Sequence, residues 1–358
     1  GILQIDRCTL SGNVAAYAGA IYNAARSNAA AIIESSTFSG NSAGGTGAVY
    51  NDGAWGGFAQ LSFNACTFSG NYSGGGGGTI RNDGRFGGRA ELGIGNTILN
   101  LGHSNVTIEN DAGTAMTLGH NLSSDGAGGV LTHATDRLHT APLLGPLQDN
   151  GGPTLTHALL PGSLAIDAGS RHAYGYPIDL DQRGLPRTHD APDIGNAAGG
   201  DGCDVGAVEF IPPLTVQKQK LKLSFAKPDA DCFSLTALLD PGGGFAPAGQ
   251  VLALDLGGAT VMLNLDEKGR AATAPGVVPA GKARLSARKG TSQWTLTVSF
   301  KQGSWQSPWA AWGLVNADVP KPGQVVTVLA VVQLGSQHFA EWLPMTYTAK
   351  AGKSGATK

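Results

Sequence analysis

Charged residues are scarce in this chain of 358 residues, since only 14% are Asp, Glu, Lys or Arg and the formal net charge is -2. So small a net charge argues against a nucleic-acid partner, because binding to a phosphate backbone needs an excess of Lys and Arg. No apolar run reaches the roughly 18 residues that a membrane-spanning helix needs. A basic amphipathic helix that could lie on a membrane surface is also missing.

Cysteine and histidine, at four and eight residues, offer little for metal or redox chemistry. Cys8 and Cys66 fall at the same place in a repeat two steps apart, roughly 9.6 Å by strand spacing, which is too far for a disulfide. We expect both to be buried as small apolar side chains, whereas Cys203 and Cys232 could pair with each other. The histidines have no metal-ligand spacing such as HExxH, and no G-x-S-x-G motif occurs.

Glycine, in contrast, is abundant at 55 residues, and short motifs recur along the first part of the chain. Copies of one six-residue motif begin at residues 8, 36, 66 and 96, as CTLSGN, STFSGN, CTFSGN and the weaker NTILNL. Two other segments keep this period: AIYN, AVYN and TIRN at 20–23, 48–51 and 79–82, and LQI, LSF and LGI at 3–5, 61–63 and 92–94. A period of about 30 residues is typical of stacked repeats.

Each repeated segment alternates apolar with small or polar residues, which indicates a strand with one buried face. Three such strands per period predict an all-β fold, in which residues 1–135 form a right-handed parallel β-helix. We expect asparagines at two equivalent turn positions to stack into amide ladders, because Asn tolerates left-handed turns and hydrogen-bonds to its counterpart in the next coil. These structural ladder residues are Asn13, Asn41 and Asn71, and Asn23, Asn51 and Asn82.

The charge changes sign along the chain. Residues 1–210 hold 9 Arg, no Lys and 18 acidic residues, whereas residues 211–358 hold 15 basic and 8 acidic residues. This switch predicts a domain boundary at Ile211–Pro213. After it, alternating runs within 215–350 predict an immunoglobulin-like β-sandwich of about seven to eight strands, and 351–358 a flexible tail. Four tryptophans could form a platform for sugars or lie buried in the sandwich: Trp305, Trp309, Trp312 and Trp342.

Residues 136–210 carry the most specific motifs, which are LQDNGGPTLTHALLPGSLAIDAGS, DLDQRGLPRT and GCDVGAVEF. In this order they resemble the end segment of secreted bacterial β-helix proteins of the choice-of-anchor Q type, and the repeats resemble the polymorphic outer-membrane-protein class of β-helix. The DIGNAAGG stretch at 193–200 departs from that pattern. The resemblance implies an extracellular or cell-surface bacterial protein whose C-terminal part serves as an anchor or sorting module, and it implies no catalytic activity.

The residues of 136–210 also predict a terminal cap, because an open solenoid end exposes strand edges and apolar interior. Five apolar residues could plug that end: Leu155, Leu159, Leu160, Leu164 and Ile166. A calcium site is the alternative reading of the acidic loops, although Arg183 and Arg187 would compete for the carboxylates; otherwise we expect no cofactor. The calcium candidates are Asp179, Asp181 and Asp193, with Asp190, Asp201 and Asp204.

These features predict a non-enzymatic extracellular structural or adhesive protein, and a polysaccharide lyase, hydrolase or carbohydrate-binding protein is the alternative. Catalysis would need paired carboxylates on one exposed face. Asp52 and Asp83 recur in NDG turns one coil apart, and the remaining acids near strands are Asp6, Glu34, Glu91 and Glu109. We expect as partners a second copy bound head to tail, another surface protein, or a cell-surface polysaccharide.

Overall fold

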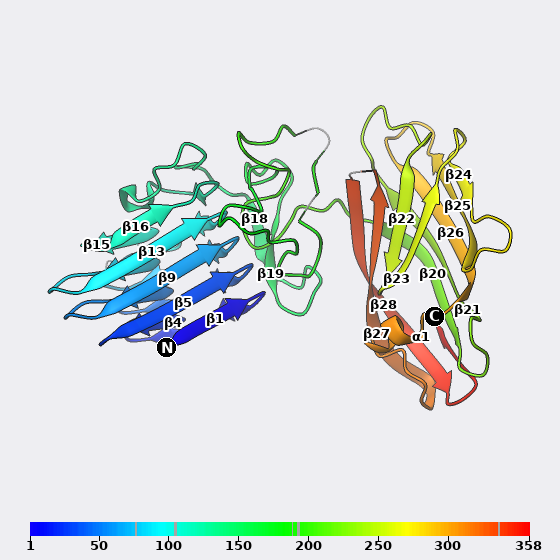
Figure 1. Cartoon of the computed structure of the whole chain (residues 1–358), viewed down its shortest axis with the longest axis horizontal. Helices are drawn as coiled ribbons and strands as arrows, with labels where there is room; N and C mark the ends of the chain where they lie inside the picture. The colour runs from blue at the N-terminus through cyan, green and yellow to red at the C-terminus, as the bar shows by residue number, and fades with distance from the viewer. Residues whose placement is uncertain (76, 104–105, 188, 192–193, 336) are drawn as a thin grey trace. The chain divides into compact units, whose positions relative to one another are not determined.

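The computed structural model describes residues 1–75, 77–103, 106–187, 189–191, 194–335 and 337–358, and its regular structure is almost entirely β (Figure 1). The chain divides into two compact units, Gly1–Phe210 and Ile211–Lys358. This boundary coincides with the change in charge. The helices of the described residues are a few residues long, and none has the length and apolar character needed to cross a membrane.

The first unit is a solenoid-like stack of short parallel strands, which Figure 1 shows as successive arrows from β1 to β16. One five-stranded sheet comprises β1 (Ile2–Asp6), β5 (Asn28–Glu34), β9 (Phe58–Asn64), β13 (Arg89–Gly95) and β16 (Thr114–Thr117). A second comprises β2 (Thr9–Ser11), β6 (Thr37–Ser39), β10 (Thr67–Ser69), β14 (Ile98–Asn100) and β17 (Leu122–Ser123). The stacking of parallel strands predicted from the repeats is confirmed.

Two smaller parallel sheets complete each coil. One comprises β3 (Val14–Ala15), β7 (Ser42–Ala43) and β11 (Tyr72–Ser73), and the other β4 (Ile21–Ala24), β8 (Val49–Asp52), β12 (Ile80–Asp83) and β15 (Ile108–Asp111). The first coils thus have four strands rather than the three that we predicted. The additional strand is two residues long, too short to leave a period-2 pattern in the sequence.

The register of the coils follows the sequence repeats with one slip. Leu61 pairs with Leu92 and Ile80 with Val49, as the motifs predict. The fourth six-residue copy, however, is displaced by one residue, because Thr67 pairs with Ile98. Thr97, and not Asn96, therefore takes the place of Cys66. Identical side chains stack inside the coils, as shown by the rings of Phe38 and Phe68 at 4.6 Å between centroids.

Residues 136–210, which we call the lateral segment, lie along the side of the stack and not across its end. The segment contains an antiparallel pair, β18 (Leu144–Gln148) and β19 (Thr156–Leu159), beside the carboxyl ends of β1, β5 and β9 (Figure 1). Apolar residues of the lateral segment bury Ile98 and Leu122, on the outer face of the second sheet. The prediction of a terminal cap is wrong, because the segment docks on outward-facing side chains of the second sheet, including Thr37 and Thr67.

The five apolar residues that we expected to plug the end of the solenoid do not all lie in a core. Leu159 and Ile166 are buried, but Leu155, Leu160 and Leu164 are 46%, 43% and 55% exposed. A short 3-10 turn, η1 (Ala127–Gly129), packs instead on β15, and Ala127 and Leu131 join the solenoid core. In the first coil, the inward-facing Leu3 is 44% exposed.

The second unit is a ten-stranded antiparallel sheet in the order β23-β22-β27-β28-β29-β20-β21-β26-β25-β24. Its elements are β20 (Thr215–Ser224), β21 (Asp231–Leu239), β22 (Val251–Leu256), β23 (Ala259–Asn264), β24 (Arg270–Ala272), β25 (Ala280–Ala287), β26 (Trp294–Gly303), α1 (Gln306–Ala310), β27 (Val319–Leu334), β28 (Gln337–Lys350) and β29 (Ser354–Thr357). Buried residues from both halves of the sheet form one cluster, so the sheet curls around a shared core.

The end of the chain belongs to this sheet. Strand β29 pairs with β20 and with β28, and Thr357 is buried. The prediction of a flexible tail at 351–358 is therefore wrong. The basic, glycine-containing sequence has no apolar pattern that would predict a strand. The strand is stabilised by pairing with two neighbouring strands and not by its own apolar residues.

Candidate functional site

Both sets of asparagines form hydrogen-bonded ladders. Asn13 Nδ2 donates to Asn41 Oδ1 at 2.8 Å, and Asn41 Nδ2 donates to Asn71 Oδ1 at 3.0 Å. In the other ladder the amide bonds run from Asn23 to Asn51 at 2.7 Å and from Asn51 to Asn82 at 2.8 Å. The buried amides of Asn41 and Asn51 each donate to one neighbouring coil and accept from the other, so the ladder satisfies these polar groups.

The second ladder has a further member that the sequence analysis missed. Asn82 Nδ2 donates to Asn110 Oδ1 at 2.8 Å. The signal was present, because TIEN at 107–110 matches TIRN at 79–82. These contacts make the ladders a structural feature.

The paired aspartates of the NDG turns are held by their own turns and by tyrosines. Asp52 accepts from the backbone N–H of Ala54 at 3.0 Å and from the Tyr22 hydroxyl at 2.5 Å. Asp83 accepts from Arg85 through its backbone and guanidinium, and from the Tyr50 hydroxyl at 2.9 Å. Burial raises the pKa of Asp83, but the hydrogen bonds from Arg85 and Tyr50 outweigh it, so its pKa is below the ordinary value.

The same turns hold two aromatic rings in solvent. Trp55 and Phe86 are 77% and 58% exposed, and their rings stack at 4.2 Å between centroids with 15° between planes. Both have positive φ, 60° and 57°, a strained conformation for a bulky residue. Gly53 allows the backbone of the next coil to approach closely, because a Cβ on it would lie 1.8 Å from the Arg89 carbonyl oxygen. We call Trp55 and Phe86 the aromatic ledge.

A row of rings crosses the outer face of the adjoining sheet. Tyr22 and Tyr50 occupy one register position on β4 and β8, with ring centroids 5.2 Å apart. The Arg81 guanidinium follows on β12, 5.4 Å from the centre of the Tyr50 ring. Burial and the hydrogen bond to Asp52 raise the pKa of Tyr22 to about 12. Rings and planar ionic groups therefore share one side of the solenoid.

This surface is not among the sites predicted from the sequence. The signal was a repeated turn, NDGAWGGF at 51–58 and NDGRFGGR at 82–89. The Asp of each copy indicates a turn, and the aromatic residue two positions after the Gly is the additional signal for this surface. Only the φ values and exposures show that the rings point outward.

Other acidic residues do not form a free carboxylate pair. Glu91 lies in a groove of about 470 Å³ on the first sheet, where it accepts from Gln60 at 2.9 Å. It is the one carboxylate among the described residues that line this groove. Glu34 accepts from the Tyr176 hydroxyl at 2.6 Å, Asp6 is paired with Arg7 at 3.0 Å, and Glu109 is 3.7 Å from Arg81.

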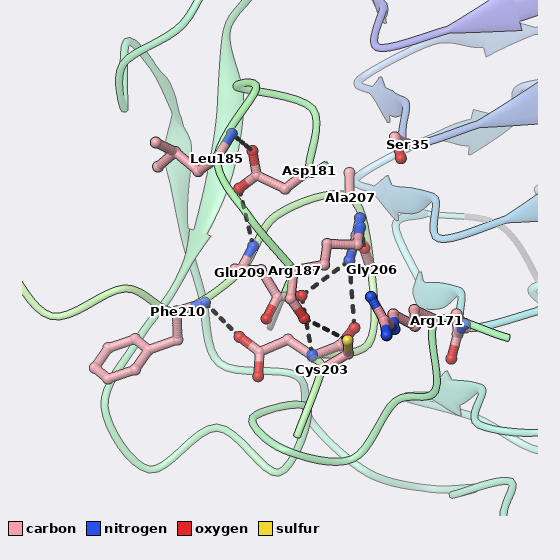
Figure 2. Close-up of polar contacts among 12 residues, drawn as sticks. Ser35, Arg171, Asp181, Leu185, Arg187, Cys203, Gly206, Ala207, Glu209 and Phe210 are labelled. Carbon is pink, nitrogen blue, oxygen red and sulfur yellow. Dashed lines mark hydrogen bonds and ion pairs between the residues drawn. The ribbon is translucent and has the colours of Figure 1, made fainter. Parts of the chain in front are cut away.

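The lateral segment has a charged interior, drawn in Figure 2. Arg187 is 1% exposed, and it donates to Glu209 Oε1 at 3.0 Å and to the Gly206 carbonyl at 2.8 Å. The backbone N–H of Asp204 donates to the same Glu209 oxygen at 3.0 Å. The Asp204 carboxylate accepts from the backbone of Asp167 and Phe210. The loops of this segment are thus tied together by buried ions.

In this interior the Glu209 carboxyl group is paired with Arg187, whereas the Asp204 carboxyl group accepts from backbone N–H groups. Burial raises the pKa of Asp204 to about 8, and burial together with the Asp204 charge raises the pKa of Glu209 well above its ordinary value. Burial also raises the pKa of Asp167 to about 6. The excess of carboxyl groups over cations means that the cluster retains a proton at a pH where exposed acids are ionised.

Gln182 and Thr67 dock the lateral segment on the stack. Gln182 Nε2 donates to the Cys8 carbonyl at 3.0 Å, and its Oε1 accepts from the Thr37 hydroxyl at 2.6 Å. The Ala207 N–H donates to the Thr67 hydroxyl at 2.9 Å. The threonine at the second position of each of the first three six-residue copies thus holds this segment against the stack.

The calcium candidates make contacts within the protein. Asp181 accepts from the backbone N–H groups of Arg183, Leu185 and Glu209. Asp179 is 2.9 Å from the Arg171 guanidinium, and Asp201 accepts from the Arg171 backbone. Within the part of the chain that the structure describes, no group of three His, Cys, Asp or Glu residues could hold a metal. Asp193 lies outside the described residues, and the charge of Asp190 acts on the nearby Asp167 carboxyl group.

Two of the four tryptophans considered for a sugar platform are buried, as are Cys66 and Cys203, whereas Cys8 and Cys232 are partly exposed. Trp305 and Trp309 are buried, and Trp309 Nε1 donates to the Leu256 carbonyl at 2.7 Å. Trp312 and Trp342 are half-buried and in edge contact at 5.7 Å between centroids. These rings support the reading of a packed core over a sugar platform. All four cysteines carry free thiols, including Cys203 and Cys232.

Comparison of the chain with models of protein families, with curated proteins and with solved structures found no match. The resemblance to choice-of-anchor Q proteins therefore stays a prediction from the motifs.

Proposed function

We propose that this chain is a non-enzymatic extracellular protein with a structural or adhesive role, in which a right-handed parallel β-helix presents a recognition surface along its side. The observation that carries the proposal is the aromatic ledge, where a strained backbone keeps the rings of Trp55 and Phe86 in solvent. Stacked exposed rings beside planar polar groups suit the apolar face and the hydroxyls of a sugar.

The carboxylates near the ledge support adhesion over catalysis. Asp52 and Asp83 are occupied by turn N–H groups and tyrosine hydroxyls, and the pKa of Asp83 is lowered. A general acid needs the opposite, a carboxyl group with a raised pKa that faces the substrate. The motif resemblance supports location at a bacterial cell surface, with the second unit, which we interpret as an immunoglobulin-like sandwich, as the attachment module.

Assembly into a filament or surface array belongs to the same proposal. The acidic first unit and the basic second unit have complementary charge, and a head-to-tail contact of this kind propagates without closing.

A glycan array probed with the whole chain tests the recognition surface, with released sugar measured in parallel. We expect bound glycans without released reducing or unsaturated ends, and loss of binding in Trp55→Ala/Phe86→Ala. Tyr72→Ala, an exposed ring elsewhere on the stack, is the matched control. Release of products by the wild-type chain that disappears in Asp52→Asn would replace adhesion by catalysis, the alternative function.

A further inference from the structure

One face of the second unit carries basic side chains in a regular array. On β20, β26, β25 and β24, alternate residues are buried in the core and the intervening ones face outward. The outward basic residues, which we call the basic face, are Lys218, Lys220, Lys222, Arg270, Lys282, Arg284 and Lys301.

Strand register places these residues in straight rows across the sheet. In one row, Lys218 pairs with Thr236, Thr236 with Thr297, Thr297 with Arg284, and Arg284 with Arg270. The next row runs Lys220, Ser234, Ser299, Lys282. Each row thus has hydroxyl groups in the middle and cations at both sides. From β20 to β25 is about 14 Å by strand spacing, and successive rows are about 7 Å apart.

A groove of about 690 Å³ lies at the β25 side of this face. Its lining includes Arg270, Lys282 and Arg284 together with the hydroxyls of Thr297 and Ser299. Asp266 is the carboxylate among the described lining residues, and its Oδ1 accepts from the backbone N–H groups of Lys268 and Arg270 at 2.8 Å each. The groove therefore presents donors and positive charge.

The cations of the basic face form no ion pair with any residue that the structure describes. None of the seven forms a salt bridge with a described residue, and every salt bridge found among the described residues lies in the first unit. Arg270 and Arg284 face each other directly across two strands, and like charges opposite each other destabilise a sheet. An arrangement that costs stability and lacks an internal partner points to an anionic ligand.

We propose that the basic face binds an acidic polysaccharide, whose carboxylate or sulfate groups meet the lysines and arginines and whose hydroxyls meet the threonine and serine rows. Arg and Lys form strong charge-assisted hydrogen bonds with such groups. This proposal names the partner through which the attachment module of the proposed function would act.

The chemistry of the face favours a polysaccharide over a nucleic acid. Single-stranded nucleic acids bind where bases stack on exposed rings, but the aromatic residues of β21 and β26 face the core or pack on other rings. Phe233 and Phe300 are buried, and Trp294 contacts Phe245 at 5.3 Å between centroids. The outer face of a many-stranded sheet also lacks the helix or two-stranded ribbon that enters the major groove of a duplex.

Binding measurements on the full chain test this inference. The probes are polygalacturonate as a carboxylate polymer, dextran sulfate as a sulfate polymer, neutral dextran, and single-stranded oligothymidine. We expect binding to one or both acidic polysaccharides and none to neutral dextran, with affinity falling as salt rises. Which acidic polymer binds more tightly identifies the anionic group.

The decisive variant is Lys282→Gln/Arg284→Gln, and its matched control is Lys289→Gln/Lys321→Gln, which removes the same charge from exposed positions outside the basic face. We expect the dissociation constant to rise at least about tenfold in the first variant and less than about twofold in the control. An equal loss in both variants, absence of binding to both acidic polymers, or tighter binding to oligothymidine would each overturn the proposal. So would self-association that depends on Lys282 and Arg284 without polysaccharide binding.

The ledge variant separates this inference from the proposed function. Trp55→Ala/Phe86→Ala should bind acidic polysaccharide as the wild-type chain does, because its substitutions lie in the first unit. Released sugar measured in the same mixtures would refute the non-enzymatic proposal without affecting the binding result.

Discussion

The solenoid and the lateral segment bury polar groups in two different ways. Inside the stack, neutral asparagine amides hydrogen-bond to copies of themselves, as Asn41 does with Asn13 and Asn71. In the lateral segment the buried groups are ions, with Arg187 against Glu209 and Asp204 close by. A repeat supplies each amide with an identical neighbour at the right distance, whereas an irregular chain has no such neighbour. The irregular segment instead holds its loops together with buried charged groups. Removal of one partner of a buried ion pair lowers the free energy of unfolding more than removal of a neutral amide does.

Removal of the buried cation should give the largest effect. Arg187→Met leaves Glu209 and Asp204 buried without their positive partner, and we expect the first unit to lose about 3 to 5 kcal/mol of unfolding free energy. Urea denaturation at pH 8 measures it. Arg171→Met, which breaks the exposed pair with Asp179, should cost less than about 1 kcal/mol. Similar losses in the two variants would show that the buried ion pair stabilises the first unit no more than the exposed pair does.

Removal of a ladder amide should cost less. Asn41→Ala removes the amide oxygen that accepts from Asn13 and the amide N–H that donates to Asn71, and we expect a loss of about 1 to 3 kcal/mol. Asn13→Ala, at the exposed end of the ladder, is the control and should cost under about 1 kcal/mol. If thermal unfolding of Asn41→Ala matches that of the wild-type chain, the ladder does not stabilise the stack.

The buried acids should give the first unit an unusual dependence on pH. The folded pKa values of Asp204 and Asp167, about 8 and about 6, lie above those of an unfolded chain. The folded state therefore binds more protons between about pH 4 and pH 8, so stability is fully present at the low end and falls as pH rises. We expect the unfolding free energy, measured by urea denaturation, to be lower at pH 8 than at pH 5.

Asp204→Asn provides the control for the pH measurement, because it removes the group that titrates at the upper end. Its unfolding free energy should change less between pH 6 and pH 8 than that of the wild-type chain. A wild-type profile that rises with pH through this window would contradict the assignment of a raised pKa to the cluster.

The charge contrast between the two units should give the weakest effect. If acidic and basic units associate head to tail, sedimentation velocity should show larger species at about 0.05 M salt than at about 0.5 M, where exposed charges are screened. Negative-stain microscopy at low salt would show whether these species are fibres. A monomer at high protein concentration and low salt rules the association out.

Much of the stack was predictable, because residues at equivalent positions of a sequence repeat contact one another in neighbouring coils. The period gave the parallel pairing, and Asn23, Asn51 and Asn82 indicated where amides would meet. The slip at Thr97 was not visible, because the fourth copy has diverged and a single residue of register has no local signature. Asn110 was visible in TIEN but was overlooked.

The position of the lateral segment could not be read from its motifs. The apolar residues of AIDAG and DVGAVEF predict burial, but they do not indicate which surface of the solenoid buries them. Contacts between residues far apart in sequence, such as Gln182 with Thr37 and Ala207 with Thr67, hold the lateral segment on the side of the solenoid. The strand at Ser354–Thr357 arose in the same way, from partners and not from its own residues.

The sequence by itself determined the all-β class, the stacked coils, the division near residue 210 and the opposite charges of the two parts, because these depend on local pattern and composition. Only the tertiary structure decided which face the lateral segment covers, that Trp55 and Phe86 meet in solvent, and that Lys218 and Arg284 fall in one row across four strands. The physical reason is that backbone dihedrals in a turn and register between distant strands are set by the packing of the whole unit, and a one-residue change in either would turn these side chains to another face.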